Sequence, residues 1–84
     1  MAIDPKHLIQ LTEILDCQSF TVAAERLNTS QPALSRMASA LEAQLGAPIF
    51  TSRRNPVTPT TLGTELASYG RSIRAATEQT SKLA

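Results

Sequence analysis

The sequence is poor in the residues that build redox, metal and catalytic sites. Cys17 is the only cysteine, so an intrachain disulfide and a metal site made from cysteines are both excluded. His7 is the only histidine and has no evident partner, and the three glycines form no phosphate-cradling loop. We find neither a nucleophile with a plausible base nor paired carboxylates in a shared site. The sequence therefore predicts no enzyme, no catalytic residue, no metal and no cofactor in these residues.

Long apolar runs are also absent. No stretch approaches the length of a membrane span, and the N-terminus lacks the basic-then-apolar signature of a signal peptide. A single cysteine suits a reducing compartment. We therefore expect a cytoplasmic or nucleoid-associated protein of a cell without a nucleus, with no membrane partner. The 84 residues, 42% of them apolar, leave room for one small globular domain with a modest core.

The charge is small but unevenly placed. The formal net charge of +1 is by itself a weak argument for a nucleic-acid partner. Residues 1–28 hold two basic and four acidic side chains, a net −2, whereas residues 29–60 hold three arginines and one glutamate, a net +2. Positive charge is therefore concentrated in the middle of the chain, where it would meet phosphate.

Two short helices are predicted at the start of the chain. Asp4 followed by Pro5 is typical of a helix start, with an N-cap acceptor before a proline at the first helical position. This helix should fade near residues 17–19, after which Ser19 or Thr21 can cap the second. Both carry apolar side chains at helical spacing: Leu8, Leu11, Ile14 and Leu15, then Ala23, Ala24 and Leu27.

A third helix follows a tight polar turn at residues 28–30. Thr29 and Ser30 are both competent N-caps, and Pro32 costs little in the first turn because that N–H has no intrahelical partner. Gly46 suits the left-handed position at the helix end, and Pro48 prevents continuation. Two helices joined in this way are what a helix-turn-helix needs to read a DNA major groove. The side chains expected inside are Ala33, Leu34, Met37, Leu41 and Leu45.

The apolar stripe leaves a polar face on the third helix. An amide such as that of Gln31 pairs bidentately with adenine, and Arg36 has the donors for guanine or a phosphate. Thr29 and Ser30, beside the free N–H groups of the helix start, predict a phosphate site. Taken singly, each feature has a plainer explanation as a cap, a first turn or a solvated arginine; their joint order favours DNA. The face consists of Gln31, Pro32, Ser35, Arg36 and Ser39.

A wing and a long helix are predicted after the third helix. Short strands near residues 49–51 and 57–59 would flank a basic tip, where Arg53 and Arg54 can meet a minor groove or its phosphates. Alone, the two arginines are more typical of a solvated loop than of a DNA contact. Thr60 or Thr61 can cap a last helix that reaches the chain end without a stop signal, so we expect the chain to be a fragment cut within a longer helix.

The last helix carries a heptad-like stripe, with spacings of four and three residues. The stripe comprises Leu62, Leu66, Tyr69, Ile73, Ala76, Thr80 and Leu83. It predicts a dimerisation seam formed by all of these except the polar Thr80. On the pattern alone, packing of the stripe against the chain's own core is an equal alternative.

The third helix opens with Ser30-Gln31-Pro32-Ala33, and Leu41-Glu42, Leu45-Gly46 and Phe50 follow at fixed spacing. With this motif the sequence resembles the N-terminal domain of the LysR-type transcriptional regulators. Three positions depart from the family pattern: Ser52, where arginine is usual; Asn55, where a basic residue is frequent; and Pro59, where leucine is usual. The matching residues keep the family's order without a gap over the first three quarters of the chain: Ser19-Phe20-Thr21, Ala23-Ala24, Leu27, residues 30–35, Leu41-Glu42, Leu45-Gly46, Ile49-Phe50, Val57, Thr60 and Gly63.

The resemblance implies a mostly α fold. It places a winged helix-turn-helix of three helices and a short two-stranded wing in residues 1–60, and a linker helix that pairs in a homodimer in residues 61–84. It implies base contacts from Gln31, Pro32 and Ser35, with Arg36 on base or backbone. It also implies an effector domain of periplasmic-binding-protein type beyond the linker, a small-molecule inducer for that domain, and contact of the full-length protein with RNA polymerase.

The leading hypothesis is a sequence-specific regulator of transcription that binds double-stranded DNA as a dimer, at an interrupted palindromic operator. A winged-helix domain used only for protein assembly is the second hypothesis; apolar residues on the exposed face of the third helix would favour it. A small enzyme is the third, and only a measured hydrolysis or transfer activity would revive it.

Overall fold

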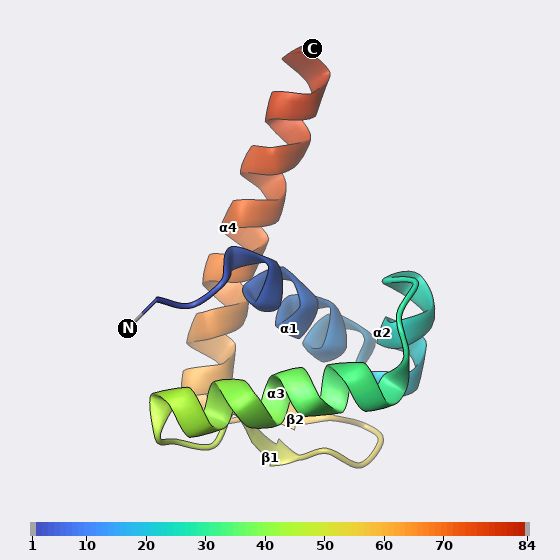
Figure 1. Ribbon diagram of the computed structural model, residues 1–84, viewed down its shortest axis with the longest axis vertical. Coiled ribbons are helices and arrows are strands. Elements are labelled where there is room, and N and C mark those ends of the chain that lie inside the picture. The colour runs from blue at the N-terminus through green and yellow to red at the C-terminus, as the bar shows by residue number, and fades with distance from the viewer. Residues whose placement is uncertain (1, 84) are drawn as a thin grey trace.

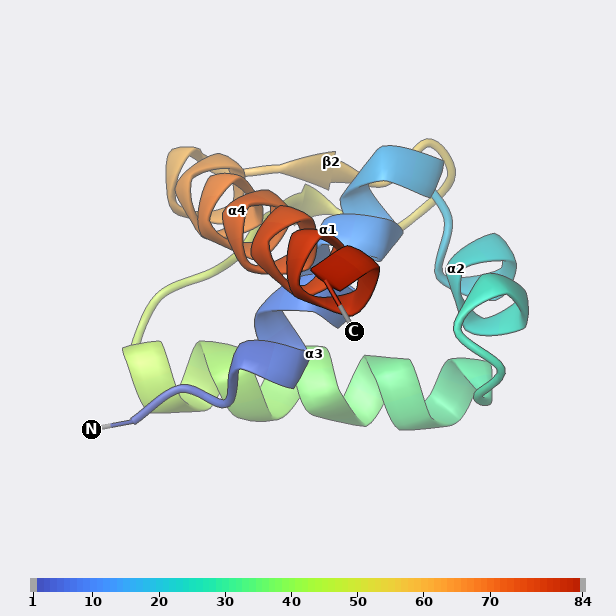
Figure 2. The same cartoon turned by 90° about the horizontal axis from the view of Figure 1, so that it is seen from above.

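The computed structural model describes residues 2–83. Helices α1, α2 and α3 and the base of α4 form the body, and the distal half of α4 stands out from it (Figure 1). Seen from above, α3 and the wing lie along opposite sides of the body with α1 between them (Figure 2). The mostly helical fold with a short wing is confirmed. Its elements are α1 (Pro5–Cys17), α2 (Phe20–Arg26), α3 (Gln31–Leu45), β1 (Phe50–Ser52), β2 (Thr58–Pro59) and α4 (Thr61–Leu83).

Capping side chains set where the helices begin. The side-chain oxygens of Asp4, Ser19 and Ser30 each accept a hydrogen bond from a first-turn N–H, at 2.9, 3.1 and 3.2 Å. The Thr60 hydroxyl does the same for α4, at 3.1 Å. At the other end of α3, Gly46 has a φ of 69°, the left-handed conformation in which glycine carries no Cβ penalty. The predicted helix starts and the predicted end of α3 are therefore confirmed, with one cap chosen from each pair of alternatives. The predicted end of the last helix, at residue 84, lies outside the described residues.

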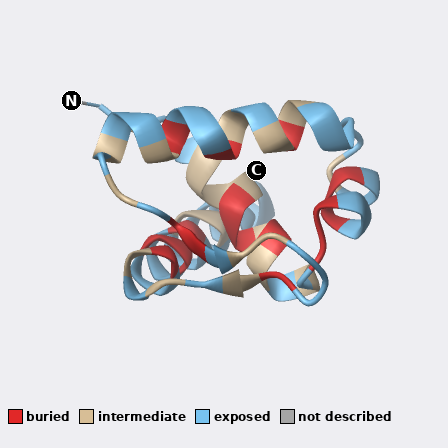
Figure 3. Cartoon of the chain, turned by 90° about the horizontal axis from the view of Figure 1, so that it is seen from below, coloured by how far each residue is buried: buried red, intermediate tan, exposed pale blue. Residues whose placement is uncertain are grey.

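The core lies between the inner faces of the four helices and the wing. The outer faces are exposed and the inner ones buried (Figure 3). The predicted apolar stripes face the core, and Ala38 is a core residue that the sequence reasoning missed. Six of the predicted stripe residues are only half-buried: Leu8, Leu15, Leu27, Ala33, Met37 and Leu45. The largest fully buried side chains are Leu11, Thr12, Ile14, Leu34, Leu41, Ile49 and Val57.

The wing is a two-stranded antiparallel ladder. Phe50 lies opposite Pro59 and Ser52 opposite Thr58, with a register irregularity between them. In this ladder both strands are edges, where a proline without an N–H is tolerated. The predicted first strand was placed one residue too early, and the second strand is one residue shorter than predicted.

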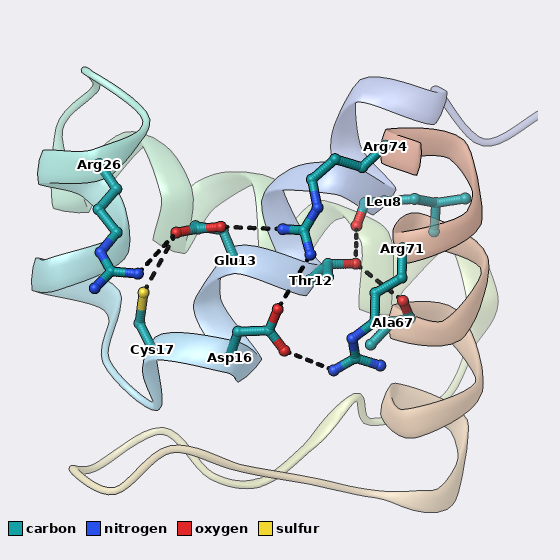
Figure 4. Close-up of polar contacts among 9 residues, drawn as sticks. All are labelled: Leu8, Thr12, Glu13, Asp16, Cys17, Arg26, Ala67, Arg71 and Arg74. Carbon is teal, nitrogen blue, oxygen red and sulfur yellow. Dashed lines mark hydrogen bonds and ion pairs between the residues drawn. The ribbon is translucent and has the colours of Figure 1, made fainter. Parts of the chain in front are cut away.

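Helix α4 comes unusually close to α1. A Cβ at Gly70 would lie 2.0 Å from Thr12 Oγ1 and 2.4 Å from the Leu8 carbonyl oxygen, so only glycine fits there. The Thr12 hydroxyl lies between two carbonyl oxygens, 2.8 Å from that of Leu8 and 3.1 Å from that of Ala67 (Figure 4). This buried hydroxyl ties α1 to α4 and satisfies its own hydrogen-bonding need.

The two halves of α4 have different surroundings. Leu66 is buried in the chain's own core and Leu62 packs against it. By contrast, Tyr69 is 64% exposed and Leu83 is 88% exposed. Packing against the chain's own core therefore applies to the first half of the stripe. For the exposed half, the dimerisation seam stays a prediction. Leu66, predicted in the dimerisation seam, is only 6% exposed and has almost no surface to offer a second chain, so that prediction is wrong for Leu66.

Candidate nucleic-acid interface

Although α3 and the wing run along opposite sides of the body, the start of α3, helix α2 and the tip of the wing lie at the same end of the molecule (Figures 1 and 2). The turn between α2 and α3 is held by the chain itself. Asn28 adopts a left-handed φ of 56°, a conformation that asparagine tolerates better than most residues. The Thr29 N–H donates to the Ala24 carbonyl at 2.9 Å. The turn thereby presents the first turns of α3 at the molecular surface.

The predicted DNA-contacting residues of α3 form one accessible, polar surface. The oxygen of Ser30 accepts the Ala33 N–H, which leaves its own O–H free to donate. The helix start adds partial positive charge at the same place. Ser35 is half-buried, and the exposed members are Thr29, Ser30, Gln31, Pro32, Arg36 and Ser39.

Ion pairing divides the arginines into two groups. Within residues 2–83, Arg36 on α3 and Arg54 at the wing tip make no ion pair, and both are exposed. The remaining four, Arg26, Arg53, Arg71 and Arg74, each contact a carboxylate. Two unpaired guanidinium groups on α3 and the wing are what a phosphate backbone would meet.

A polar cluster joins α1 to α4 and α2 (Figure 4). The guanidinium of Arg71 lies 2.6 Å from Asp16 Oδ1. Arg74 bridges Glu13 at 3.2 Å and Asp16 at 3.4 Å, and Arg26 reaches Glu13 at 3.5 Å. Two of the four acidic residues at the start of the chain, Glu13 and Asp16, therefore bind arginines of the same molecule.

The cluster shifts the pKa of Asp16 and of Cys17. Burial alone would raise the pKa of Asp16, but hydrogen bonds and charge attraction from Arg71 and Arg74 outweigh it, so the pKa lies below the usual value. Burial and the nearby Glu13 carboxylate raise the pKa of the Cys17 thiol, whose sulfur lies 3.5 Å from Glu13 Oε1. Cys17 is thus kept as a neutral thiol, with low reactivity.

The sequence reasoning missed this cluster. The only local signal is the spacing of its members: Glu13 and Asp16 lie three residues apart, as do Arg71 and Arg74, which puts each pair on one helix face. Nothing local says that these two faces meet.

The two wing arginines differ in their surroundings. Arg54 is exposed, whereas the guanidinium of Arg53 lies 2.5 Å from Glu42 Oε1 and 5.1 Å from the centroid of the Phe50 ring. The sequence had placed both on DNA and had given Glu42 no function. The contact of Glu42 with the wing is therefore a second feature that the sequence reasoning missed.

Other kinds of site are not evident in residues 2–83. No three or more His, Cys, Asp or Glu side chains in this part are grouped so that they would hold a metal ion. None of its helices combines the length and the apolar character needed to cross a membrane.

The sequence matches the family model described as bacterial regulatory helix-turn-helix protein, lysR family, over residues 5–64. A small neutral protease regulatory protein of Streptomyces coelicolor is 37% identical over 73 residues, which are 87% of this chain and 22% of that protein. The nitrogen assimilation regulatory protein nac of Escherichia coli K12 is 36% identical over 74 residues, 88% of this chain and 24% of that protein. The chain thus spans under a quarter of the length of either relative.

Solved structures agree with the sequence matches. A complex of the BenM DBD with catB site 1 DNA superposes with a TM-score of 0.84 at 30% identity, covering 96% of this chain and 90% of that one. Full-length LysG of Corynebacterium glutamicum, with bound effector Arg, gives a TM-score of 0.88 at 30% identity, over 96% of this chain and 28% of that one. On the match over residues 5–64 and the shared fold, this chain belongs to the LysR family of bacterial regulatory helix-turn-helix proteins.

Proposed function

We propose that this chain is the DNA-binding part of a transcriptional regulator, and that it binds double-stranded DNA sequence-specifically as a homodimer. The observation that carries the proposal is the exposed polar start of α3 with its unpaired Arg36, at the same end of the molecule as the wing tip. A similar domain, the BenM DBD, has been solved on DNA. The domain boundary near residue 60 belongs to the proposal, with α4 as the linker.

The side chains of α3 would divide between bases and phosphates. Gln31, Pro32 and Ser35 would lie against base edges in the major groove, where an amide or a short hydroxyl fits between the bases. Arg36 would reach a base or a phosphate, and Ser39 would lie further along the groove. Thr29 and Ser30 would hold a phosphate at the helix start.

The exposed half of α4 is the proposed dimer seam. An open hollow of about 580 Å³ runs along it, lined by Ile73, Ala76, Thr77, Thr80 and Ser81, with no charged side chain among them. Tyr69 and Leu83 add exposed apolar area to this half of the helix. A second copy of the helix would cover these side chains, with Leu62 at the edge of the seam. Two-fold symmetry then predicts an interrupted palindromic operator.

The remaining functions would belong to a longer regulator. The LysG structure holds a bound effector, Arg. By analogy, we propose that a small-molecule inducer binds outside these 84 residues and that the full-length protein contacts RNA polymerase.

Selection from random double-stranded DNA tests the proposal. We expect enrichment of two half-sites related by a two-fold axis, and a logarithm of the binding constant that falls linearly with the logarithm of the salt concentration. Failure to enrich any sequence, or salt-independent binding, would contradict it. A chain that still dimerises but selects no DNA would instead favour the assembly-only hypothesis.

Two substitutions in α3 separate base reading from phosphate binding. Gln31→Ala should relax the preference at one base pair, by about 1–3 kcal/mol of discrimination. Arg36→Ala distinguishes a base contact from a phosphate contact. If Arg36 contacts a base, the substitution relaxes the preference at one base pair. If Arg36 contacts a phosphate, binding to all sequences weakens alike, and the slope of the logarithm of the binding constant against the logarithm of the salt concentration (the salt slope) falls by about 1. Gln10→Ala, on α1 and outside both proposed surfaces, is the matched control. A uniform loss with Gln31→Ala would show that Gln31 does not read bases.

A further inference from the structure

We infer that the two consecutive arginines of the wing have different functions: Arg53 is a positioning residue that fixes the wing against α3, and Arg54 is the arginine that meets DNA. The inference rests on the proposed function for the part that concerns Arg54. It reassigns Arg53, which the sequence had placed on DNA.

Arg53 is held by three elements of its own chain. Its guanidinium lies 2.5 Å from Glu42 Oε1 on α3, 5.7 Å from the Phe20 ring centroid at the start of α2, and 5.1 Å from the Phe50 ring centroid in β1. The two rings are 5.4 Å apart and tilted by 56°. Distances below about 6 Å from a ring centroid are within cation–π range. The side chain is only 34% exposed, so its charge is already neutralised and partly desolvated.

Glu42 is itself held in position. Its second oxygen, Oε2, accepts the backbone N–H of Ile49 at 2.8 Å, directly before β1. The Glu42 carboxylate therefore binds the chain on both sides of β1: Ile49 just before the strand and Arg53 just after it. Because Glu42 lies on α3, its contacts set the position of the wing relative to the helix that carries Gln31 and Arg36.

Arg54 has the opposite surroundings. Its side chain is exposed and makes no ion pair within residues 2–83. Its backbone N–H donates to Ser52 Oγ at 3.2 Å, a local bond that shapes the turn just before the tip. Ser52 occupies the position where arginine is usual in the family. In this chain the serine shapes the backbone, and the charge at the tip is supplied two residues later.

The decisive test is Glu42→Gln, measured as affinity for the selected DNA. A glutamine still accepts the Ile49 N–H but no longer holds the Arg53 charge. If Arg53 positions the wing, binding weakens, by roughly two- to fivefold for an ion pair of this exposure. If Arg53 contacts DNA itself, freeing it leaves binding unchanged or makes it tighter, which would overturn the inference. Glu25→Gln, at an exposed carboxylate on α2, corrects for the loss of one negative charge.

A double substitution gives a second readout. Arg54→Gln should lower the salt slope by about 0.9, one phosphate contact. Adding Arg53→Gln to it should lower the slope no further, because the wing then has no charged tip left to position. Slopes that fall additively, by about twice as much, would assign Arg53 to a phosphate and contradict the inference.

Amide hydrogen exchange on the free chain tests the positioning function without DNA. We expect Arg53→Gln, but not Arg54→Gln, to speed exchange in residues 49–59 several-fold. Equal exchange in both variants would overturn the positioning function. A parent chain that selects no DNA would overturn the proposed function and the assignment of Arg54, while leaving the exchange result to decide on Arg53.

Discussion

The junction between α1 and α4 and the surface formed by α3 and the wing tip both carry pairs of arginines, but they use them in opposite ways. At the junction, Arg71 and Arg74 meet Asp16 and Glu13, and the Thr12 hydroxyl is bonded. At the other surface, Arg36 and Arg54 have no carboxylate partner within residues 2–83. At the junction the arginines are paired with carboxylates of their own chain. On the surface of α3 and the wing tip the two arginines are left for a partner outside the chain.

The difference teaches how to interpret a nearly neutral chain. A net charge of +1 conceals a molecule in which four arginines neutralise carboxylates of their own chain. The ion pairs, more than the net charge, indicate which arginine side chains are free to bind a polyanion. Substitutions in each region, and acid, test this contrast.

The largest effect is expected from Gly70→Ala, at the closed junction. The added Cβ would collide with Thr12 Oγ1 and with the Leu8 carbonyl, which is backbone and cannot rotate away. We expect a loss of about 3 kcal/mol in the free energy of unfolding, which corresponds to roughly 10–20 °C in melting temperature. Ser72→Ala, on the exposed side of α4, is the control. An unchanged melting temperature would show that α1 and α4 pack less tightly than the contrast requires.

An intermediate effect is expected from removing equal charge from the two regions. Arg71→Gln with Arg74→Gln should lower the free energy of unfolding by about 1 kcal/mol or less, since the two arginine side chains are a third to a half exposed. It should leave the salt slope of DNA binding unchanged. Arg36→Gln with Arg54→Gln should do the reverse, lowering the slope by up to about 2 with little change in stability. Identical behaviour of the two double variants would abolish the contrast.

The smallest effect is expected in acid. The folded pKa of Asp16 lies below the unfolded value, so the unfolded chain binds more protons in the window between them. The stabilisation from Asp16 is therefore complete above the usual aspartate pKa and is lost as the pH falls through the folded value. Asp16→Asn should destabilise the chain at pH 7 and narrow the difference between urea unfolding at pH 7 and at pH 3. An equal difference in both proteins would mean that the pair with Arg71 contributes nothing.

The sequence predicted contacts between residues close together in the chain, and it did not predict contacts between residues far apart in it. The caps at Asp4, Ser19 and Ser30 and the stop at Gly46 are bonds or conformations within three residues. Asp4 and Gly46 were predicted outright, and Ser19 and Ser30 each as one of two alternatives. The polar face of α3 also followed from helical spacing. Its contact with DNA remains a prediction.

Contacts between distant residues were beyond such reasoning. Arg71 meets Asp16 across 55 positions, and Arg53 meets Glu42 across 11. Neither can be inferred from local spacing, because the crossing of α1 with α4 and the path of the wing are fixed only by packing. The sequence therefore assigned Arg53 to DNA simply because it is basic and lies in a loop.

The glycine at the crossing has a mechanical consequence. Helix α4 extends 13 residues beyond Gly70 to Leu83, which at 1.5 Å per residue is about 20 Å. A rigid lever of this length turns a tilt of about 10° at the crossing into a displacement of about 3.5 Å at its far end. The tight fit of Gly70 against Thr12 and Leu8 thus leaves α4 little freedom to tilt relative to α1. It determines how accurately two copies joined along the outer part of α4 would set the separation of their α3 helices.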